Sequence, residues 1–145
     1  MLHIKNNFFV LSTYILLTCS CISETKGQAP QEVKSTFIDM YPNENDPDWH
    51  LDKNGNYESH FKIDGISYRA DFTPEGKWIE TESSIDKKDV PKAIKEAIED
   101  NYKDLKIVEI EKVQHHSKGT FYDVEFKKDG SKVDIEFNSK GEIIN

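Results

Sequence analysis

The sequence predicts an α+β fold: two tandem helix-plus-antiparallel-meander repeats that share one sheet, with the helices packed on one face. Three observations support this prediction. Apolar residues recur first at helical spacing and then at every second position. The alternating segments are separated by turn sequences such as Asp-Gly. The whole order occurs twice along the chain, which indicates an internal duplication.

The N-terminal residues 1–23 are interpreted as an export signal. Lys5 precedes a short apolar run over residues 8–21, a pattern typical of a signal and too short to span a bilayer stably. The two cysteines, Cys19 and Cys21, lie at its end, so the rest of the chain has neither a disulfide nor a thiol nucleophile. Cys21 is the candidate lipidation site. Lipid anchoring and free secretion are equal alternatives, and we expect the protein to be exported, to the periplasm or outer membrane or outside the cell.

Residues 24–145 are predicted to form a single domain. They carry 18 of the 19 Lys and Arg residues and all 27 Asp and Glu residues, giving a formal charge of −9. This charge argues against nucleic acid as a partner. A chain of this length can bury roughly two-thirds of its unfolded surface, so we expect a monomer that needs no cofactor to fold.

The duplication is clearest in two similar segments. "YESHFKIDG" at 57–65 matches "YDVEFKKDG" at 122–130, and the same offset of 65 relates Gly76 to Gly141. The predicted repeats span residues 30–82 and 90–145. Each begins with a proline-led helix whose apolar stripe faces the core. The two stripes are Val33, Phe37, Met40 and Tyr41, and Ile94, Ala97, Ile98 and Tyr102.

Turn chemistry predicts how the strands pair. Asp64-Gly65 and Asp129-Gly130 suit two-residue hairpins, and "TPEG" and "NSKG" suit type I turns followed by a left-handed glycine. The segment "KIVEIEKV" at 106–113 adds a first strand to the second repeat. The resulting register places four pairs on the helix side: Tyr57 with Phe72, Phe61 with Tyr68, Tyr122 with Phe137, and Phe126 with Val133. Trp78 and Ile143 extend the same side.

The chain resembles the PepSY-like exported bacterial proteins, which are described as β-lactamase-inhibitor-like. The resemblance covers about residues 30–145 and rests on "TFIDMYP", "DFTPEGKWIETE", "DVPKAIKEAI", "FYDVEFKKDG" and "IEFNSKGEII". It implies tandem helix-plus-sheet repeats, an exported location and no catalytic residues. It also implies a protein partner, with inhibition of an enzyme as one form that the binding takes.

The alternate strand positions predict a polar open face without aromatic residues. The same register places Glu58 opposite Asp71, and like charges on opposed positions destabilise a sheet. Our hypothesis is an acidic surface that binds a cationic protein segment or a divalent ion, and the alternative is an ordinary solvated face. The candidate partner-binding residues on this face are Glu58, Asp71, Asp123, Glu125, Asp134 and Glu136.

Trp49 is the remaining candidate partner-binding residue, either as a rim anchor or as part of the core. The neighbouring stretch 46–58 does not match an EF-hand, because the glycine alignment places His50 first and Phe61 twelfth. We interpret it as a turn, with weak calcium binding as the alternative. No metal site is predicted, since His60 and the His115–His116 pair lack companion ligands at useful spacing.

The serines, carboxylates and glycines form no recognisable catalytic or phosphate-binding motif. We therefore predict a non-enzymatic exported binding protein that recognises a protein or peptide and could inhibit it. The alternative is a cell-envelope protein that binds a cation or a small ligand.

Overall fold

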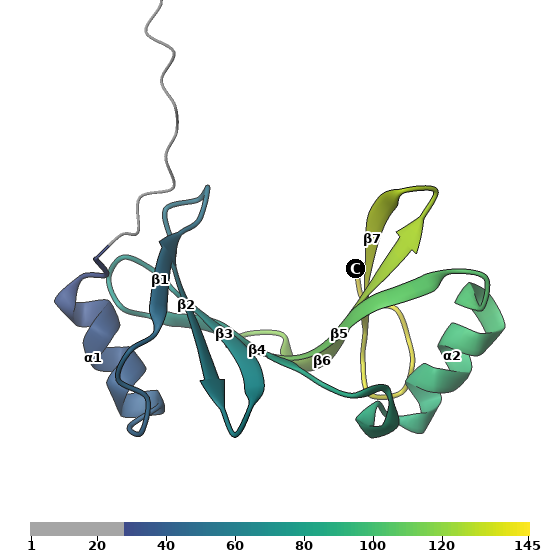
Figure 1. Cartoon of the computed structure of the whole chain (residues 1–145), viewed down its shortest axis with the longest axis horizontal. Coiled ribbons are helices and arrows are strands. Elements are labelled where there is room, and N and C mark those ends of the chain that lie inside the picture. Colours follow the sequence, from purple (N-terminus) through teal and green to yellow (C-terminus); the bar gives the residue numbers. More distant parts are fainter. Residues whose placement is uncertain (1–27) are drawn as a thin grey trace, which may run out of the picture.

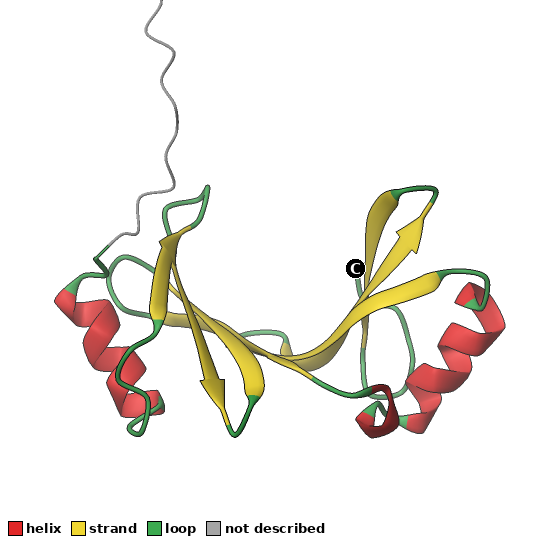
Figure 2. Cartoon of the chain, in the orientation of Figure 1, coloured by secondary structure: helices red, strands yellow, loops and turns green. Residues whose placement is uncertain are grey.

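The computed structural model describes residues 28–145, so the predicted export signal, Cys19 and Cys21 lie outside the described residues. Two α-helices, one 3₁₀ turn and seven strands follow one another along the chain (Figures 1 and 2). The elements are α1 (Gln31–Met40), β1 (Asp48–Leu51), β2 (Tyr57–Ile63), β3 (Ile66–Phe72), β4 (Trp78–Ser84), η1 (Lys87–Asp89), α2 (Lys92–Tyr102), β5 (Lys106–His115), β6 (Gly119–Lys128) and β7 (Ser131–Phe137).

The seven strands form one antiparallel sheet in the order β1 to β7. The sheet is strongly twisted, and α1 and α2 lie at its opposite ends (Figure 1). The predicted α+β class and the shared sheet are therefore confirmed, and β5 is the extra strand predicted from "KIVEIEKV". Among residues 28–145, no helix combines the length and the apolarity needed to cross a bilayer.

Both helices pack on the same side of the sheet. Ala70, in the core beneath α1, pairs with Thr81, which in turn pairs with Gln114. Side chains alternate along β5, so Gln114 points to the same side as Ile110, a core residue beneath α2. The predicted placement of the helices on one face is correct.

The hairpin turns explain why the strand register could be predicted. Asp64 and Asp129 have φ of 52° and 49°, and the glycines that follow them have φ of 83° and 85°, as a tight two-residue turn requires. All four predicted aromatic and apolar pairs on the helix side are present. Ile143, predicted to extend this side, forms a bridge to Phe137 but remains 51% exposed.

The first core lies beneath α1. Val33 and Phe37 are buried, and Phe37 meets Phe61 edge to face with ring centroids 5.1 Å apart. Phe72 is also completely buried against this cluster. Met40 departs from the predicted stripe and is 38% exposed, because it lies at the last turn of α1, beyond the edge of the core. Tyr41 instead packs on Phe61.

The second core lies beneath α2. Ile94, Phe126 and Phe137 are completely buried, and Tyr102 at the end of α2 stacks on Phe126 at 5.3 Å. The two cores are joined through the pairing of β4 with β5. On the helix side, polar residues such as Gln114 occupy the junction between them.

A glycine lies against the first turn of each helix. A Cβ atom on Gly76 would lie 2.6 Å from the carbonyl oxygen of Glu32, and one on Gly141 would lie 2.5 Å from that of Ala93. Both glycines have a left-handed φ, near 80°. Only glycine allows the turn to approach the helix backbone this closely.

The C-terminal residues cover part of the outer edge of β7. Ile143 bridges Phe137, and the amide of Ile144 donates to the carbonyl of Glu136 over 3.0 Å. The side-chain amide of Asn145 donates to the carbonyl of Asp134. This edge of the sheet is therefore partly closed by the chain itself.

Candidate functional site

The side of the sheet opposite the helices, here called the open face, carries a concentration of carboxylates. In the second half they form two rows of three across β5, β6 and β7, because paired residues point to the same side. The rows are Glu111–Asp123–Glu136 and Glu109–Glu125–Asp134. In the first half, Glu58 pairs with Asp71, which pairs with Glu80. The predicted like-charge pairs are therefore present.

Arg69 neutralises much of the first half. Its Nη2 atom lies 2.7 Å from Glu82 Oε1 and 3.9 Å from Glu80 Oε1, and its Nε atom lies 3.3 Å from Asp71 Oδ1. The Nε contact to Asp71 is close but not aligned as a hydrogen bond. One partly buried guanidinium on β3 therefore forms ion pairs with three carboxylates, one on β3 and two on β4.

Among the described residues, two lysines form ion pairs with acids of the second half. Lys132 Nζ contacts Glu125 Oε2 at 2.9 Å, and Lys118 Nζ contacts Glu136 Oε2 at 3.2 Å. Asp123 Oδ1 and Glu125 Oε1 are buried atoms without a hydrogen-bond partner among the described residues. Buried acceptors without a donor are costly, so these two oxygens destabilise the second half as it stands.

These carboxylates surround a shallow hollow of about 250 Å³. Its lining is Arg69, Glu82, Glu109, Glu111, Asp123, Glu125 and Asp134. The predicted residues Asp123, Glu125 and Asp134 are thus brought together. Glu136 lies beside them, whereas Glu58 and Asp71 belong to the first half with Arg69.

Burial makes several of these carboxyl groups hard to ionise. It raises the pKa of Glu82 to about 8 and that of Asp71 to about 7, although Arg69 opposes both shifts. Burial, with the nearby charges of Asp134 and Glu136, raises the pKa of Asp123 to about 6. The pKa of Glu111 is raised by burial and by Glu109. These carboxyl groups therefore release their protons at a higher pH than exposed carboxyl groups do.

We expect the free energy of unfolding to fall as the pH rises from about 5 to about 8. Across this window Glu82 and Asp71 retain protons in the folded state that an unfolded chain, with carboxyl pKa values of about 4, has already released, so stability is lost as pH rises through their folded pKa values. Glu82→Gln should flatten this dependence. Urea unfolding of both proteins at several pH values measures it. A wild-type stability that increases across the window would contradict the assignment.

Four acids that β4 and β5 place on the open face were not among the predicted site residues: Glu80, Glu82, Glu109 and Glu111. Alternation in "WIETESS" and "KIVEIEKV" places them on one side of their strands. That signal was available in the sequence. The position of Glu80 and Glu82 relative to Glu109 and Glu111, however, depends on how β4 and β5 pair, and no short turn specifies that pairing.

The prediction that the open face lacks aromatic residues is wrong. Phe121 pairs with Val113, which pairs with Glu82, so all three lie on this face. Phe121 and Val113 are 3% and 1% exposed, and Lys118 Nζ lies 5.2 Å from the Phe121 ring centroid. The cause is the length of β6, which begins at Gly119 and adds an alternate position before Asp123.

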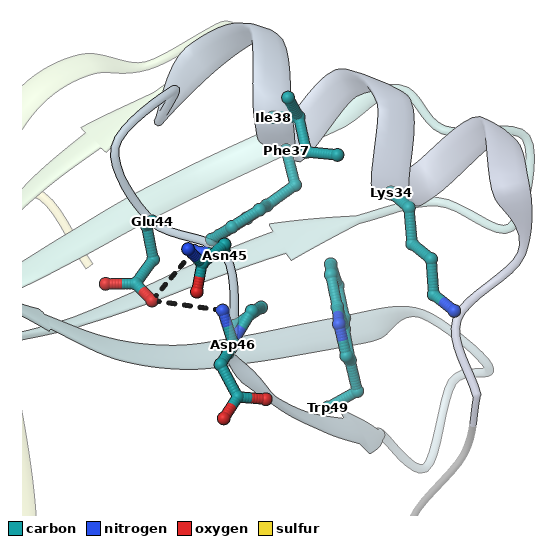
Figure 3. Close-up of a pocket in the computed structure, with 8 residues that line it drawn as sticks. Lys34, Phe37, Ile38, Glu44, Asn45, Asp46 and Trp49 are labelled. Carbon is teal, nitrogen blue, oxygen red and sulfur yellow. Dashed lines mark hydrogen bonds between the residues drawn. The ribbon is translucent and has the colours of Figure 1, made fainter.

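Trp49 lies apart from the acidic residues, on the helix side of the edge strand β1. Its ring packs on Phe37 at 5.4 Å and on Phe72 at 6.1 Å, as the core interpretation predicts. It also lines a pocket of about 280 Å³ between α1 and β1, with Ile38 and Pro47 on its walls (Figure 3). Trp49 therefore contributes to the core and to a surface pocket.

Within the stretch 46–58, residues 52–56 form the predicted turn, whereas Asp48–Leu51 form the edge strand β1, which the turn interpretation did not predict. Asp52 Oδ1 accepts the backbone amides of Asn54 and Asn56 at 2.7 and 2.8 Å, and Oδ2 accepts both side-chain amides. Burial acts to raise the pKa of the Asp52 carboxyl, but the four donors together outweigh it and hold this pKa below its usual value. Within residues 28–145, no group of three or more His, Cys, Asp or Glu side chains is arranged to hold a metal ion.

Comparison with known proteins gives one family and several similar folds. The sequence model of the family described as "Putative beta-lactamase-inhibitor-like, PepSY-like" matches residues 55–145. No curated protein matches the chain.

Several similar solved structures are from Bacteroides species. A DUF2874 family protein from Bacteroides ovatus has a TM-score of 0.74 at 20% identity, covering 82% of this chain and 86% of that one. A "putative periplasmic" protein from Bacteroides eggerthii has a TM-score of 0.74 at 24% identity, covering 82% and 88%. A BLIP-like protein from Bacteroides fragilis has a TM-score of 0.68 at 22% identity, covering 80% and 83%. At these identities the likeness shows a shared fold.

Proposed function

The chain belongs to the PepSY-like, beta-lactamase-inhibitor-like family, and we propose that it is a non-enzymatic exported binding protein whose open face recognises a cationic segment of a protein or peptide. The observation that carries this proposal is the incompletely compensated charge of the second half. Asp123 Oδ1 and Glu125 Oε1 are buried without a donor, beside four further carboxylates in the hollow. An arginine or lysine from a partner supplies both the charge and the donors.

Arg69 supports this proposal by internal comparison. In the first half, a guanidinium lies among Asp71, Glu80 and Glu82. The position equivalent to Arg69 at the offset of 65 is Asp134, so the second half has an acid where the first half has its cation. A partner's guanidinium in the second half would complete the same arrangement.

The proposal also covers the origin of the two halves, the location of the protein and the effect of binding on the partner. We infer that the two halves arose by duplication of one unit, with matching hairpins and a glycine beneath each helix as support. We place the protein in the periplasm or at the outer membrane, in line with the Bacteroides eggerthii neighbour, with Cys21 as the lipid attachment site where the protein is anchored. Where the bound partner is an enzyme, binding to this face would inhibit it.

Neutralising the hollow should abolish capture of a cationic partner. In the variant Asp123→Asn/Glu125→Gln/Asp134→Asn, we expect binding of a hexa-arginine peptide, measured by calorimetry, to weaken at least tenfold, because the three charged acceptors are lost. The fold should be unchanged by circular dichroism. Glu99→Gln/Asp100→Asn/Asp104→Asn removes the same charge from exposed positions in and just beyond α2 and should bind like the wild type.

Equal weakening by both triple variants would show that net charge alone attracts the peptide, and the proposal would be wrong. A pull-down from envelope extract with calcium or with a chelator tests the alternative function. Partner capture that resists chelator supports direct recognition. Calcium binding to the wild type that is lost in the hollow variant would instead favour a cation-binding protein.

A further inference from the structure

The two edge strands of the sheet, β1 and β7, differ in how far other residues of the chain cover their outer sides. The outer edge of β7 is partly covered by residues 143–145. At the other edge, no strand among residues 28–145 pairs with the outer side of β1. An open strand edge presents unpaired amide and carbonyl groups that can pair with another chain.

The register of β1 shows which groups face outward. The amide of Asp52 donates inward to the carbonyl of Asn56 over 2.9 Å. Backbone groups alternate in direction along an antiparallel strand, so those of His50 also point to β2, and those of Trp49 and Leu51 point to the open edge. Leu51 is 49% exposed, consistent with an accessible edge.

A preformed pocket adjoins this edge. It lies between α1 and β1, with Phe37, Ile38 and Trp49 among its walls and a volume of about 280 Å³, enough for one large apolar side chain (Figure 3). The loop that closes it is held by Glu44, whose Oε1 accepts the amides of Asn45 and Asp46 at 3.1 and 3.3 Å (Figure 3). The pocket therefore does not have to be created by a ligand.

The two sides of β1 dictate the chemistry of an added strand. A residue placed opposite Trp49 would point to the helix side, toward the pocket. Its neighbours would point to the other side, where the carboxylate of Glu58 lies with His50 and His60. An apolar residue suits the first environment and cationic residues suit the second. Two copies of this chain would instead bring their acidic edges together, over strands of only four residues.

We propose that the open edge of β1 and the adjoining pocket bind an extended peptide segment by strand addition, the segment alternating an apolar side chain in the pocket with Lys or Arg on the opposite side. The site is distinct from the acidic hollow and does not depend on it. Backbone hydrogen bonds from Trp49 and Leu51 would provide affinity, and the pocket would provide selectivity for the apolar residue.

The test uses a synthetic probe, acetyl-Thr-Lys-Val-Lys-Phe-Lys-Val-Lys-Thr-amide, and the variant with the neutralised hollow, so that the peptide has no acidic hollow to occupy. Hydrogen exchange followed by NMR reports each amide separately. We expect the amides of Trp49 and Leu51 to exchange freely in the protein alone and at least tenfold more slowly with saturating peptide. The inward amide of His50 serves as the internal reference.

Matched variants isolate the backbone contribution. Leu51→Pro removes an outward donor, which an edge strand tolerates, and Leu51→Ala truncates the side chain but keeps the donor. Leu51→Pro should bind about fivefold more weakly than Leu51→Ala, as expected for one lost hydrogen bond. A probe that is N-methylated at alternate residues keeps all its side chains but loses backbone donors. It should no longer bind to the protein with an unchanged β1.

Several results would overturn the proposal. One is binding without protection of Trp49 and Leu51, and another is equal binding by the N-methylated probe. Protection that grows with protein concentration in the absence of peptide, together with dimerisation in sedimentation, would assign the edge to a second copy. Failure of the probe to bind while hexa-arginine still binds the wild-type hollow would reject strand addition and leave the proposed function intact.

Discussion

Gly141→Ala is expected to destabilise the protein by about 3 kcal/mol, and Gly76→Ala by a similar amount. Each alanine would have to adopt a left-handed φ, which costs about 1–2 kcal/mol. Its Cβ would also lie 2.5 or 2.6 Å from a backbone carbonyl oxygen in the first turn of a helix. Backbone cannot move aside as a side chain can, so α2 or α1 would have to shift from its core, which adds a cost of about 1–3 kcal/mol.

The chain offers matched controls for this result. Gly65 and Gly130 have the same sign of φ, but a Cβ at either position meets nothing within 4 Å. Gly65→Ala and Gly130→Ala should therefore show only the cost of the backbone conformation. Urea unfolding of the four variants separates the two effects. If Gly141→Ala were no more destabilising than Gly130→Ala, the close approach of the turn to α2 would be wrong.

Phe126→Ala is expected to lower the free energy of unfolding by about 3–5 kcal/mol. Phe126 is completely buried, and its ring stacks on Tyr102 of α2. Truncation leaves a cavity that the neighbouring strands cannot close, because β6 is paired on both sides. The measurement is the urea concentration at the midpoint of unfolding. The slope of the unfolding free energy against urea should stay unchanged, which would show that unfolding exposes the same amount of surface as in the wild type.

Val133→Ala is the control for this truncation. Val133 pairs directly with Phe126 across β6 and β7 but is 36% exposed. We expect it to cost less than about 1 kcal/mol, since little apolar area is lost from the core. Comparable costs at the two positions would show that Phe126 is not the centre of the second core.

The sequence was most informative where structure is local. Asp64-Gly65 and Asp129-Gly130 admit few backbone conformations, so they specify the hairpins, and each hairpin specifies its register. That register is sufficient to predict the opposition of Glu58 and Asp71, and of Glu125 and Asp134, from the amino-acid sequence alone. Tight turns convert a short sequence pattern into a long-range arrangement of side chains.

The centre of the open face could not be predicted in this way. β4 and β5 are separated by η1 and α2, so their pairing depends on how both cores pack and not on a turn. Only that pairing brings Glu82 beside Glu111 and places Val113 and Phe121 in the middle of the face. The sequence also could not decide whether Trp49 is buried or exposed, because its burial depends on the distance between α1 and the edge strand.

The single strand pair that joins the two cores has a consequence for cooperativity. Each half buries its own aromatic cluster under its own helix, and only the ladder between β4 and β5 continues through the middle. Such a molecule contains two units that can unfold separately, joined by the pairing of β4 with β5. If one half unfolded locally, the other would keep its packed helix and most of its strands. A partner that binds to both halves at once would therefore suppress this partial unfolding in addition to covering the sheet.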